Sequence, residues 1–298
     1  MAVFLRRLNI VAAPSASSFR RSILNGSEYL RDFPEASSRG VRGFSSSPPC
    51  DQNGNLFDPS RSEGVAGSSG LRFHTWPNGG GTFHESASID ATARVEMGAI
   101  VHEKAVLGAN VCVGSGTVVG PSVAIGQSCS IGYNVSLSNC TLGESCMIHS
   151  GVCIGQDGFG FFVDEHGQVI KKPQTLYARI GNNVEIGANT CIDRGSWRDT
   201  VIGDGTKIDN LVQIGHNVII GRNCLLCGQV GIAGSVCLGD YVVLGGRAAV
   251  KDHVTITSKV RLAANSCVIK DINEPGDYGG FPAVPIGRWR RLVAARRM

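Results

Sequence analysis

The sequence predicts an all-β fold, a parallel β-helix in which short strands stack into a column of coils. The first observation is a period: from Ile89 to Val268 an aliphatic residue returns at every sixth position, with a few interruptions. The second is uniformity, because all 27 of these anchor residues are Ile, Leu or Val, and 14 of them are followed by Gly. A six-residue period fits neither an isolated helix nor an alternating sheet, and it is typical of β-solenoids.

Each six-residue unit is expected to form one short strand and one turn. Because strand side chains alternate, the anchor and the residue two positions before it both point into the column. Glycine after the anchor is expected to permit the tight turn. Three units make one coil of about 18 residues, so the anchors account for about nine coils. The second inward position is small, as the corners of a narrow prism require, at Thr117, Cys129, Val135, Cys146, Thr190, Thr206, Cys224, Val230, Val236 and Val242.

The segments that flank the repeat have other compositions. Residues 1–44 carry seven Arg and no acid before Glu28, and their end resembles a mitochondrial processing site, so they are predicted to be a mitochondrial transit peptide. A disordered basic tail is the alternative. Residues 45–86 are rich in Ser, Gly and Pro and are predicted to be a linker. The β-helix is expected over 87–273, followed by a C-terminal extension, 274–298, with a short basic helix.

Charge and hydropathy exclude two classes of partner. The formal net charge of +4 is already reached within residues 1–44, and the rest of the chain holds 21 basic and 21 acidic residues. A neutral body argues against a nucleic-acid partner. No apolar run reaches the length of a membrane span, so we expect no transmembrane segment.

Two interruptions of the repeat are candidates for function. The larger, residues 156–179, contains Asp157, Gly158, Phe159 and Phe161, and an exposed apolar loop needs a surface to cover. It is expected to form one wall of a groove, with a neighbouring copy as the other wall. A self-packed loop without a ligand is the alternative. The second interruption, residues 193–201, begins with Asp193-Arg194-Gly195.

Two histidines are expected to share one edge of the prism. His216 and His253 both lie at predicted turns and are 37 residues apart, two coils plus one residue. Stacked coils therefore place them roughly 10 Å apart along one groove. For His216, a solvated or packing role is an equally good interpretation from the residues alone. Asp209 is expected on another side of the prism, from which it reaches His216 only across a subunit boundary or through an intermediary.

The 11 cysteines follow the repeat and do not form a disulfide framework. Cys224 occupies a small inward position, where a thiol acts as a small hydrophobe. Cys224 and Cys227 spell C-x-x-C, but the strand-to-helix context of a redox motif is missing. We therefore interpret this pair as structural.

The strings IGQDGFGFF (154–162), VEIGANTCIDRG (184–195), DNLVQIGHNV (209–218) and EPGDYGGFPAVPIGRWRR (274–291) together resemble the UDP-3-O-acylglucosamine N-acyltransferases of lipid A biosynthesis. The resemblance implies a left-handed β-helix, a homotrimer and sites between subunits. It also implies transfer of a 3-hydroxyacyl chain from acyl carrier protein to the 2-amine of a UDP-3-O-acyl-glucosamine. The acyl carrier thioester is then a co-substrate, and no cofactor is expected.

Residue roles follow from the same resemblance. His216 matches the family's catalytic histidine and is expected to act as general base. His253 matches a second histidine of the site, and Asp209 matches its acidic residue. The expected substrate-binding residues are Asp157, Gly158, Phe159, Phe161, Asp209, Gln213, Asn217, Gly234, Ser235 and His253. Glycine turns such as Gly234 are expected to supply backbone donors for a tetrahedral oxyanion.

Two other functions remain open at this stage. A non-catalytic binding or scaffold protein is one, because no counterpart of the family's uridine-binding domain is recognisable before Ile89. A metalloenzyme resembling the γ-carbonic anhydrases is the other, but its characteristic pair of histidines five residues apart is missing. We therefore expect no metal site. The acyltransferase hypothesis further predicts the mitochondrial matrix as location. The C-terminal basic helix is expected either to dock an acidic carrier protein or to be a solvated helix end.

Overall fold

The computed structural model describes residues 73–295. The chain divides into two units, Met1–Ala66 and Gly67–Met298, and the described residues all belong to the second. The expected transit peptide, residues 1–44, and most of the expected linker lie outside the described residues.

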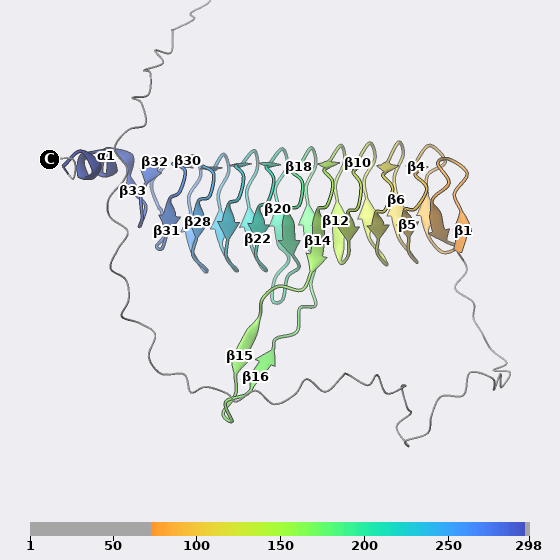
Figure 1. Ribbon diagram of the computed structural model, residues 1–298, viewed down its shortest axis with the longest axis horizontal. Coiled ribbons are helices and arrows are strands. Elements are labelled where there is room, and N and C mark those ends of the chain that lie inside the picture. Colours follow the sequence, from red (N-terminus) through yellow and green to blue (C-terminus); the bar gives the residue numbers. More distant parts are fainter. Residues whose placement is uncertain (1–72, 296–298) are drawn as a thin grey trace, which may run out of the picture. The chain divides into compact units, whose positions relative to one another are not determined.

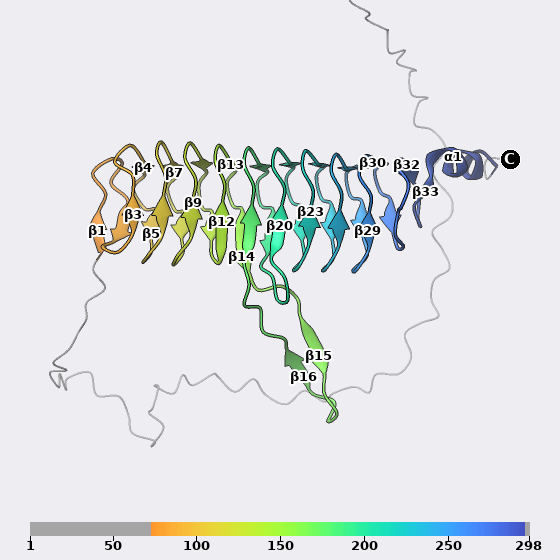
Figure 2. The same cartoon turned by 180° about the vertical axis from the view of Figure 1, so that it is seen from behind.

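Residues 73–285 form a solenoid of about 11 turns with three faces, each a mainly parallel sheet (Figures 1 and 2). Sheet 1 consists, in spatial order, of β1 (Phe73–Thr75), β2 (Thr82–His84), β5 (Ile100–Val101), β8 (Val118–Val119), β11 (Ser136–Leu137), β14 (Cys153–Gln156), β19 (Cys191–Asp193), β22 (Gln213–Ile214), β25 (Gly231–Ile232), β28 (Ala249–Val250) and β31 (Cys267–Val268).

Sheet 2 consists of β33 (Val284–Pro285), β32 (Gly276–Gly279), β30 (Val260–Leu262), β27 (Val243–Leu244), β24 (Leu225–Leu226), β21 (Lys207–Ile208), β18 (Glu185–Ile186), β13 (Met147–Ile148), β10 (Ser130–Ile131), β7 (Cys112–Val113) and β4 (Arg94–Val95). Sheet 3 consists of β29 (Thr255–Ile256), β26 (Cys237–Leu238), β23 (Ile219–Ile220), β20 (Thr200–Ile202), β17 (Ala178–Ile180), β12 (Cys140–Leu142), β9 (Ala124–Ile125), β6 (Val106–Leu107) and β3 (Ser88–Ile89).

The predicted core is confirmed. Every anchor except Ile89 is buried, and the ten small inward residues named above are buried as well. Successive anchors pair in register between coils, as Ile214 does with Ile232 and Ile232 with Val250. The core is therefore one continuous stack of aliphatic side chains along the axis.

The glycine after the anchor has a different role from the one predicted. The left-handed backbone conformation occurs three residues after the anchor, as at Asn110 (φ 57°) and Asn217 (φ 61°). Gly126 is instead a point of close approach, because a Cβ there would lie 2.6 Å from the carbonyl oxygen of Gly143 in the next coil. Glycine thus lets the coils stack, and mostly small or polar residues adopt the turn conformation.

The two ends of the solenoid extend beyond the predicted repeat, so the expected count of about nine coils is too low. Residues 73–86, expected to be linker, form β1 and β2 of sheet 1. Aromatic packing holds this end: Trp76 meets Phe83 edge-on at 5.4 Å and donates a hydrogen bond to the Ala93 carbonyl at 2.9 Å. Composition alone missed this end because its contacts are aromatic and do not follow the aliphatic period.

The C-terminal end carries the short helix that the sequence predicts. The strands β32 and β33 continue sheet 2, and α1 (Ile286–Ala295) follows and packs against β32. Within residues 73–295, no helix is long and apolar enough to cross a membrane.

The loop 156–179 contains a β-hairpin of β15 (Phe161–Val163) and β16 (Val169–Lys171). The hairpin projects from the solenoid, as both ribbon views show (Figures 1 and 2). The solenoid resumes its register directly beneath it, because β14 pairs with β19 through Cys153 and Cys191.

The two leucines of β24 provide a matched test of this core. Leu226 is 2% exposed and Leu225 is 47% exposed. We expect Leu226→Ala to lower the free energy of unfolding by about 2–5 kcal/mol, because it removes buried contacts and leaves a cavity. Leu225→Ala removes the same atoms from the outer face and should cost less than about 1 kcal/mol. Denaturant unfolding measures both, and equal losses would contradict the inward and outward assignment.

Candidate functional site

The interruptions of the repeat meet at one corner of the prism, where the strands of sheet 1 end. The hairpin leaves after β14, and the second insertion leaves after β19. His216, Gly234 and His253 follow β22, β25 and β28, the next three strands of the same sheet. Asp157 and His253, which are 96 residues apart in the chain (253 − 157), are thereby brought to one edge by the stacking of coils.

This corner contains a groove of about 820 Å³. The predicted site residues that line it are Asp157, Gly158, Phe159, Phe161, Gln213, His216, Gly234 and His253. Asn217 and Ser235 are buried beside it, next to the His216 ring and the Gly234 turn. The expectation that His216 and His253 share one groove is therefore confirmed.

Asn217 fixes the orientation of the His216 ring. Its side-chain oxygen accepts the backbone N–H of Ser196 at 2.7 Å, so its amide nitrogen faces His216 Nδ1 at 2.8 Å. In this orientation the amide donates and Nδ1 accepts. The neutral imidazole then carries its proton on Nε2.

Burial lowers the pKa of His216 below its usual value of 6.5. The nearby charges of His253 and Lys172 act in the same direction, and the backbone of Phe159 opposes them. The imidazole is therefore uncharged at neutral pH, as a proton acceptor must be.

Two glycines make room for this ring. A Cβ on Gly158 would lie 2.7 Å from the Cβ of His216, and a Cβ on Gly234 would lie 2.7 Å from its Cε1. The hairpin and the next coil thus contact the imidazole from two sides. The N–H of Gly234 donates to no acceptor within residues 73–295, which leaves a donor beside the ring.

The groove also contains Asp193, which begins the second interruption of the repeat and was not predicted to have a role. Its side chain lines the groove, although the residue is only 8% exposed. Asp193 directly follows the anchor Ile192, at the position where 14 of the other anchors have Gly. Asp90, Glu96 and Asp209 also follow anchors, so this signal marks Asp193 only together with its place in an interruption of the repeat. Lys171 and Asp252 line the groove as well, and no pattern in the sequence marks them.

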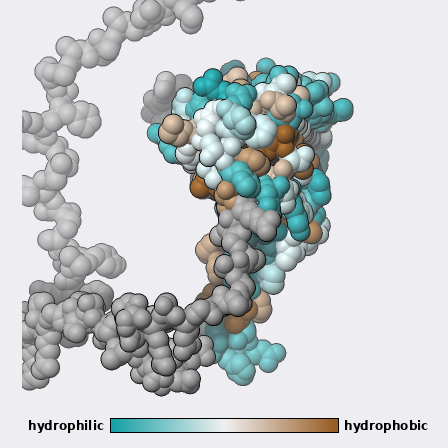
Figure 3. Space-filling view, turned by 90° about the vertical axis from the view of Figure 1, so that its right-hand side faces the viewer, coloured by the Kyte–Doolittle hydropathy of each residue, from teal (hydrophilic) through white to brown (hydrophobic). Residues whose placement is uncertain are grey.

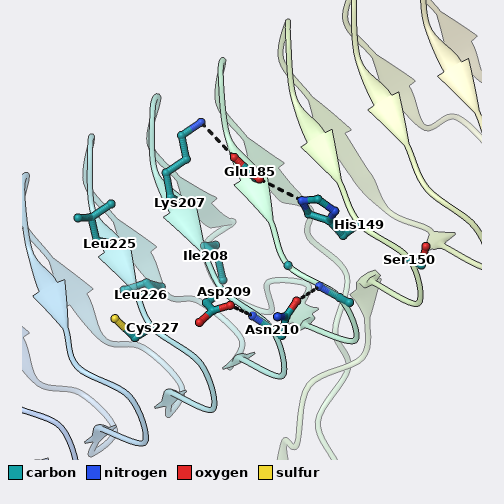
Figure 4. A pocket seen from close by; sticks show the side chains of 12 residues that line it. His149, Ser150, Glu185, Lys207, Ile208, Asp209, Asn210, Leu225, Leu226 and Cys227 are labelled. Atoms are coloured by element: carbon teal, nitrogen blue, oxygen red, sulfur yellow. Dashed lines mark hydrogen bonds and ion pairs between the residues drawn. The ribbon is translucent and has the colours of Figure 1, made fainter.

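Asp209 lies in a different groove, as expected from its place in the repeat. It follows β21 of sheet 2 and lines a cavity of about 640 Å³ (Figure 4). The same groove contains His149, whose Nε2 lies 3.0 Å from Glu185 Oε1. Within one chain, Asp209 and His216 therefore belong to separate corners.

The thiols and possible metal ligands show no second centre. Cys224 is buried and Cys227 is exposed, so the two residues of the C-x-x-C sequence point to opposite faces. Within the described part of the chain, no three His, Cys, Asp or Glu side chains are grouped closely enough to hold a metal ion.

Comparison with known proteins identifies the repeat and the solenoid. Residues 199–234 match the family model "Bacterial transferase hexapeptide (six repeats)". Among solved structures, a UDP-N-acetylglucosamine acyltransferase from Campylobacter jejuni superposes with a TM-score of 0.53 over 70% of this chain and 77% of that chain. The two are 22% identical, so this likeness shows the fold alone.

Sequence relatives identify the family. The chain is 76% identical, over 74% of its own length, to a protein from Arabidopsis thaliana named "Probable UDP-3-O-acylglucosamine N-acyltransferase 2, mitochondrial", and the match covers 73% of that relative. It is 46% identical to a UDP-3-O-acylglucosamine N-acyltransferase from Methylobacterium sp. (strain 4-46), over 55% of this chain and 46% of the bacterial protein. The chain thus spans about half the length of the bacterial relative, and it belongs to the UDP-3-O-acylglucosamine N-acyltransferase family.

Proposed function

We propose that this chain transfers a 3-hydroxyacyl group from an acyl carrier thioester to the 2-amine of a UDP-3-O-acyl-glucosamine, with His216 as general base. The observation that carries the proposal is the groove itself. It joins the DGFG segment of the hairpin, His216 and His253, which are the family-matched motifs, at one corner of the prism.

The chemistry requires a proton acceptor. A sugar ammonium is not a nucleophile, so it must lose a proton before its nitrogen attacks the thioester carbonyl. An imidazole with a lowered pKa is uncharged at neutral pH and able to take that proton, a contribution of typically about 10²–10⁴-fold. None of the described residues that line the groove is Ser or Cys, which favours direct transfer over an acyl-enzyme.

The tautomer of His216 adds a condition to this mechanism. In the described geometry Asn217 donates to Nδ1, so the Nε2 position already carries a proton. For Nε2 to accept the amine proton, Nδ1 must become the protonated nitrogen and must find an acceptor. Rotation of the Asn217 amide supplies one, at the cost of its bond to the backbone N–H of Ser196. Substrate binding must therefore reorganise this pair.

The tetrahedral intermediate requires donors for its oxyanion. The N–H of Gly234 lies beside the His216 ring and is not used by any acceptor in residues 73–295. A preorganised backbone donor of this kind stabilises developing negative charge without moving during the reaction. Collapse of the intermediate breaks the C–S bond. Of the two protons that the nitrogen loses between ammonium and amide, one is released to solvent and the other passes through His216 to the departing thiolate.

The same proposal includes a homotrimer of left-handed solenoids. The hairpin exposes Phe159, Phe161, Phe162, Val163 and Val169 to solvent in the single chain. In the space-filling view, hydrophobic residues (brown) lie near the lower end of the coloured surface (Figure 3). This is the height at which the hairpin projects from the solenoid in Figure 1. An apolar projection of this kind requires a covering surface, and a neighbouring prism supplies it. The same neighbour brings its Asp209 toward the His216 groove.

Acyl carrier protein and the mitochondrial matrix complete the proposal. Arg288, Arg290 and Arg291 are exposed on α1 and present positive charge to an acidic carrier. The Arabidopsis relative is named mitochondrial, which agrees with the Arg-rich composition of residues 1–44.

Replacement of His216 tests the assignment of the base. We expect His216→Ala to lower kcat for amide formation by about 10²–10⁴-fold, because the amine loses its proton acceptor. The assay uses the full chain, acyl carrier thioester and 3-O-acylated UDP-glucosamine, with the amide product measured by mass spectrometry. His102→Ala, in an early coil remote from the groove, is the matched control. Near-normal turnover by His216→Ala would show that another group accepts the proton.

The pH dependence of kcat/KM tests the role of Asn217. The lowered pKa of His216 means that activity is present at neutral pH and is lost only as pH falls through a value below 6.5. Asn217→Asp places a carboxylate at Nδ1, which stabilises the imidazolium and raises the pKa of His216. The acidic limb of the profile should therefore move to higher pH in this variant. An unchanged limb would mean that His216 is not the group whose protonation limits the rate.

A further inference from the structure

Asp193 is a carboxylate in the groove without a cationic partner among the described residues. Its Oδ1 accepts two hydrogen bonds, from Gln156 Nε2 at 2.9 Å and from Gln213 Nε2 at 3.3 Å. Its Oδ2 accepts none from residues 73–295 and belongs to a side chain that lines the groove. Two neutral amides thus hold one oxygen in place and leave the other available.

Lys171, which lines the groove, and Arg194, which follows Asp193 in the chain, are both committed elsewhere. Lys171 pairs with Asp157, and Arg194 lies 4.0 Å from the same carboxylate. The Arg194 side chain also donates through Nε to the carbonyl of Leu176 at 2.7 Å. Both of these positive charges pair with Asp157. No cation is among the causes that shift the pKa of Asp193, so its negative charge is not compensated by the described residues.

The backbone directs Asp193 to this place. Gln156 and Asp193 are partners in the β14–β19 pair, next to a register shift between Ile154 and Gln156. The Oε1 atom of Gln156 is buried and accepts no hydrogen bond. An acceptor oxygen without a donor thus lies beside the uncompensated carboxylate.

A buried carboxylate without a cationic partner lowers the stability of the native state. Burial raises the pKa of Asp193 to about 6, and the two glutamine amides oppose that rise. A buried charge of this kind destabilises the native state unless something binds it, and unpartnered buried carboxylates are characteristic of functional sites. The sign follows from linkage: the native state binds the proton more tightly than the unfolded chain, so ionisation of Asp193 lowers stability as pH rises from 4 toward 6.

We propose that Asp193 binds the 2-ammonium group of the amino-sugar substrate and places its nitrogen beside His216. An ammonium group supplies the missing positive charge, together with N–H donors for Oδ2. This inference rests on the proposed function and names the residue that recognises the acceptor nitrogen.

The ion pair also distinguishes the charged amine of the substrate from the neutral amide of the product. Asp193 stabilises the ammonium form, so the proton is removed by His216 and not by Asp193. When the nitrogen attacks the thioester carbonyl, a C–N bond forms and the C–S bond breaks. The nitrogen loses two protons in all, one carried by His216 to the departing thiolate and the other released to solvent. The resulting amide nitrogen is neutral, and it no longer pairs with Asp193. Attraction at this residue is therefore present before the reaction and absent after it.

Asp193→Asn is the informative variant, because both glutamine bonds go to Oδ1 and an asparagine oxygen accepts them equally well. Calorimetric titration of the full chain compares 3-O-acyl UDP-glucosamine with the matching 3-O-acyl UDP-glucose, in which a hydroxyl replaces the amine. The native chain should bind the amine at least about tenfold more tightly, since a charge-assisted pair is lost in the hydroxyl analogue. In Asp193→Asn that preference should fall to within about twofold, while affinity for the hydroxyl analogue stays the same.

Controls distinguish the inference from the proposed function. Asp252→Asn neutralises another carboxylate of the groove and should keep the preference for the amine. Asp193→Ser provides a second neutral variant, and thermal unfolding verifies that each variant is folded. An active native chain whose amine preference survives both Asp193 variants overturns this inference and leaves the proposed function standing. A native chain that forms no amide overturns the proposed function, and the inference with it.

Discussion

The structure depends on the stacking of one coil directly on the next. The anchors Ile214, Ile232 and Val250 pair in register, and backbone hydrogen bonds of about 2.9 Å join each coil to its neighbour along all three sheets. Stacking leaves so little space at many corners that a Cβ would collide with the backbone of the next coil, as at Gly126. Because of the same stacking, residues that are one coil apart in the sequence lie next to each other along one edge of the prism. Turns that follow strands of one sheet must meet, and the groove is assembled from such turns.

The electrostatics of the groove follow from this construction. Water is excluded on the side of the solenoid core, so the imidazole of His216 is kept neutral and the carboxyl of Asp193 is kept basic by the same burial. Desolvation acts on both groups in the direction that disfavours their charged forms. A positively charged acceptor relieves the penalty on the carboxylate and presents a proton to the imidazole. In the proposed reaction this burial keeps the proton acceptor His216 uncharged and favours a positive charge beside Asp193.

Periodicity predicts most of the fold and part of the site. The anchors and the small inward residues were predictable because burial repeats with the strand, and the shared edge of His216 and His253 was predictable because two coils separate them. The ends of the solenoid were not, because Trp76 and Phe83 pack by shape and follow no period. The resting tautomer of His216 was hidden too, since it depends on Ser196 fixing Asn217 from another coil. Asp193 was visible only as a broken repeat position, because its lack of a cation is a property of three-dimensional neighbours.

The hairpin is attached to the prism in a way that keeps the two independent. Strand β14 pairs directly with β19 and β12 with β17, so the anchors of successive coils stay paired beneath the insertion, with one register shift between Ile154 and Gln156. Changes in the length or composition of β15 and β16 thus leave the register of the coils untouched. The hairpin strands at the edge of the groove can therefore vary in sequence without changing the coils from which they project. A rigid repetitive column with one replaceable appendage is a simple route to new specificity within one architecture.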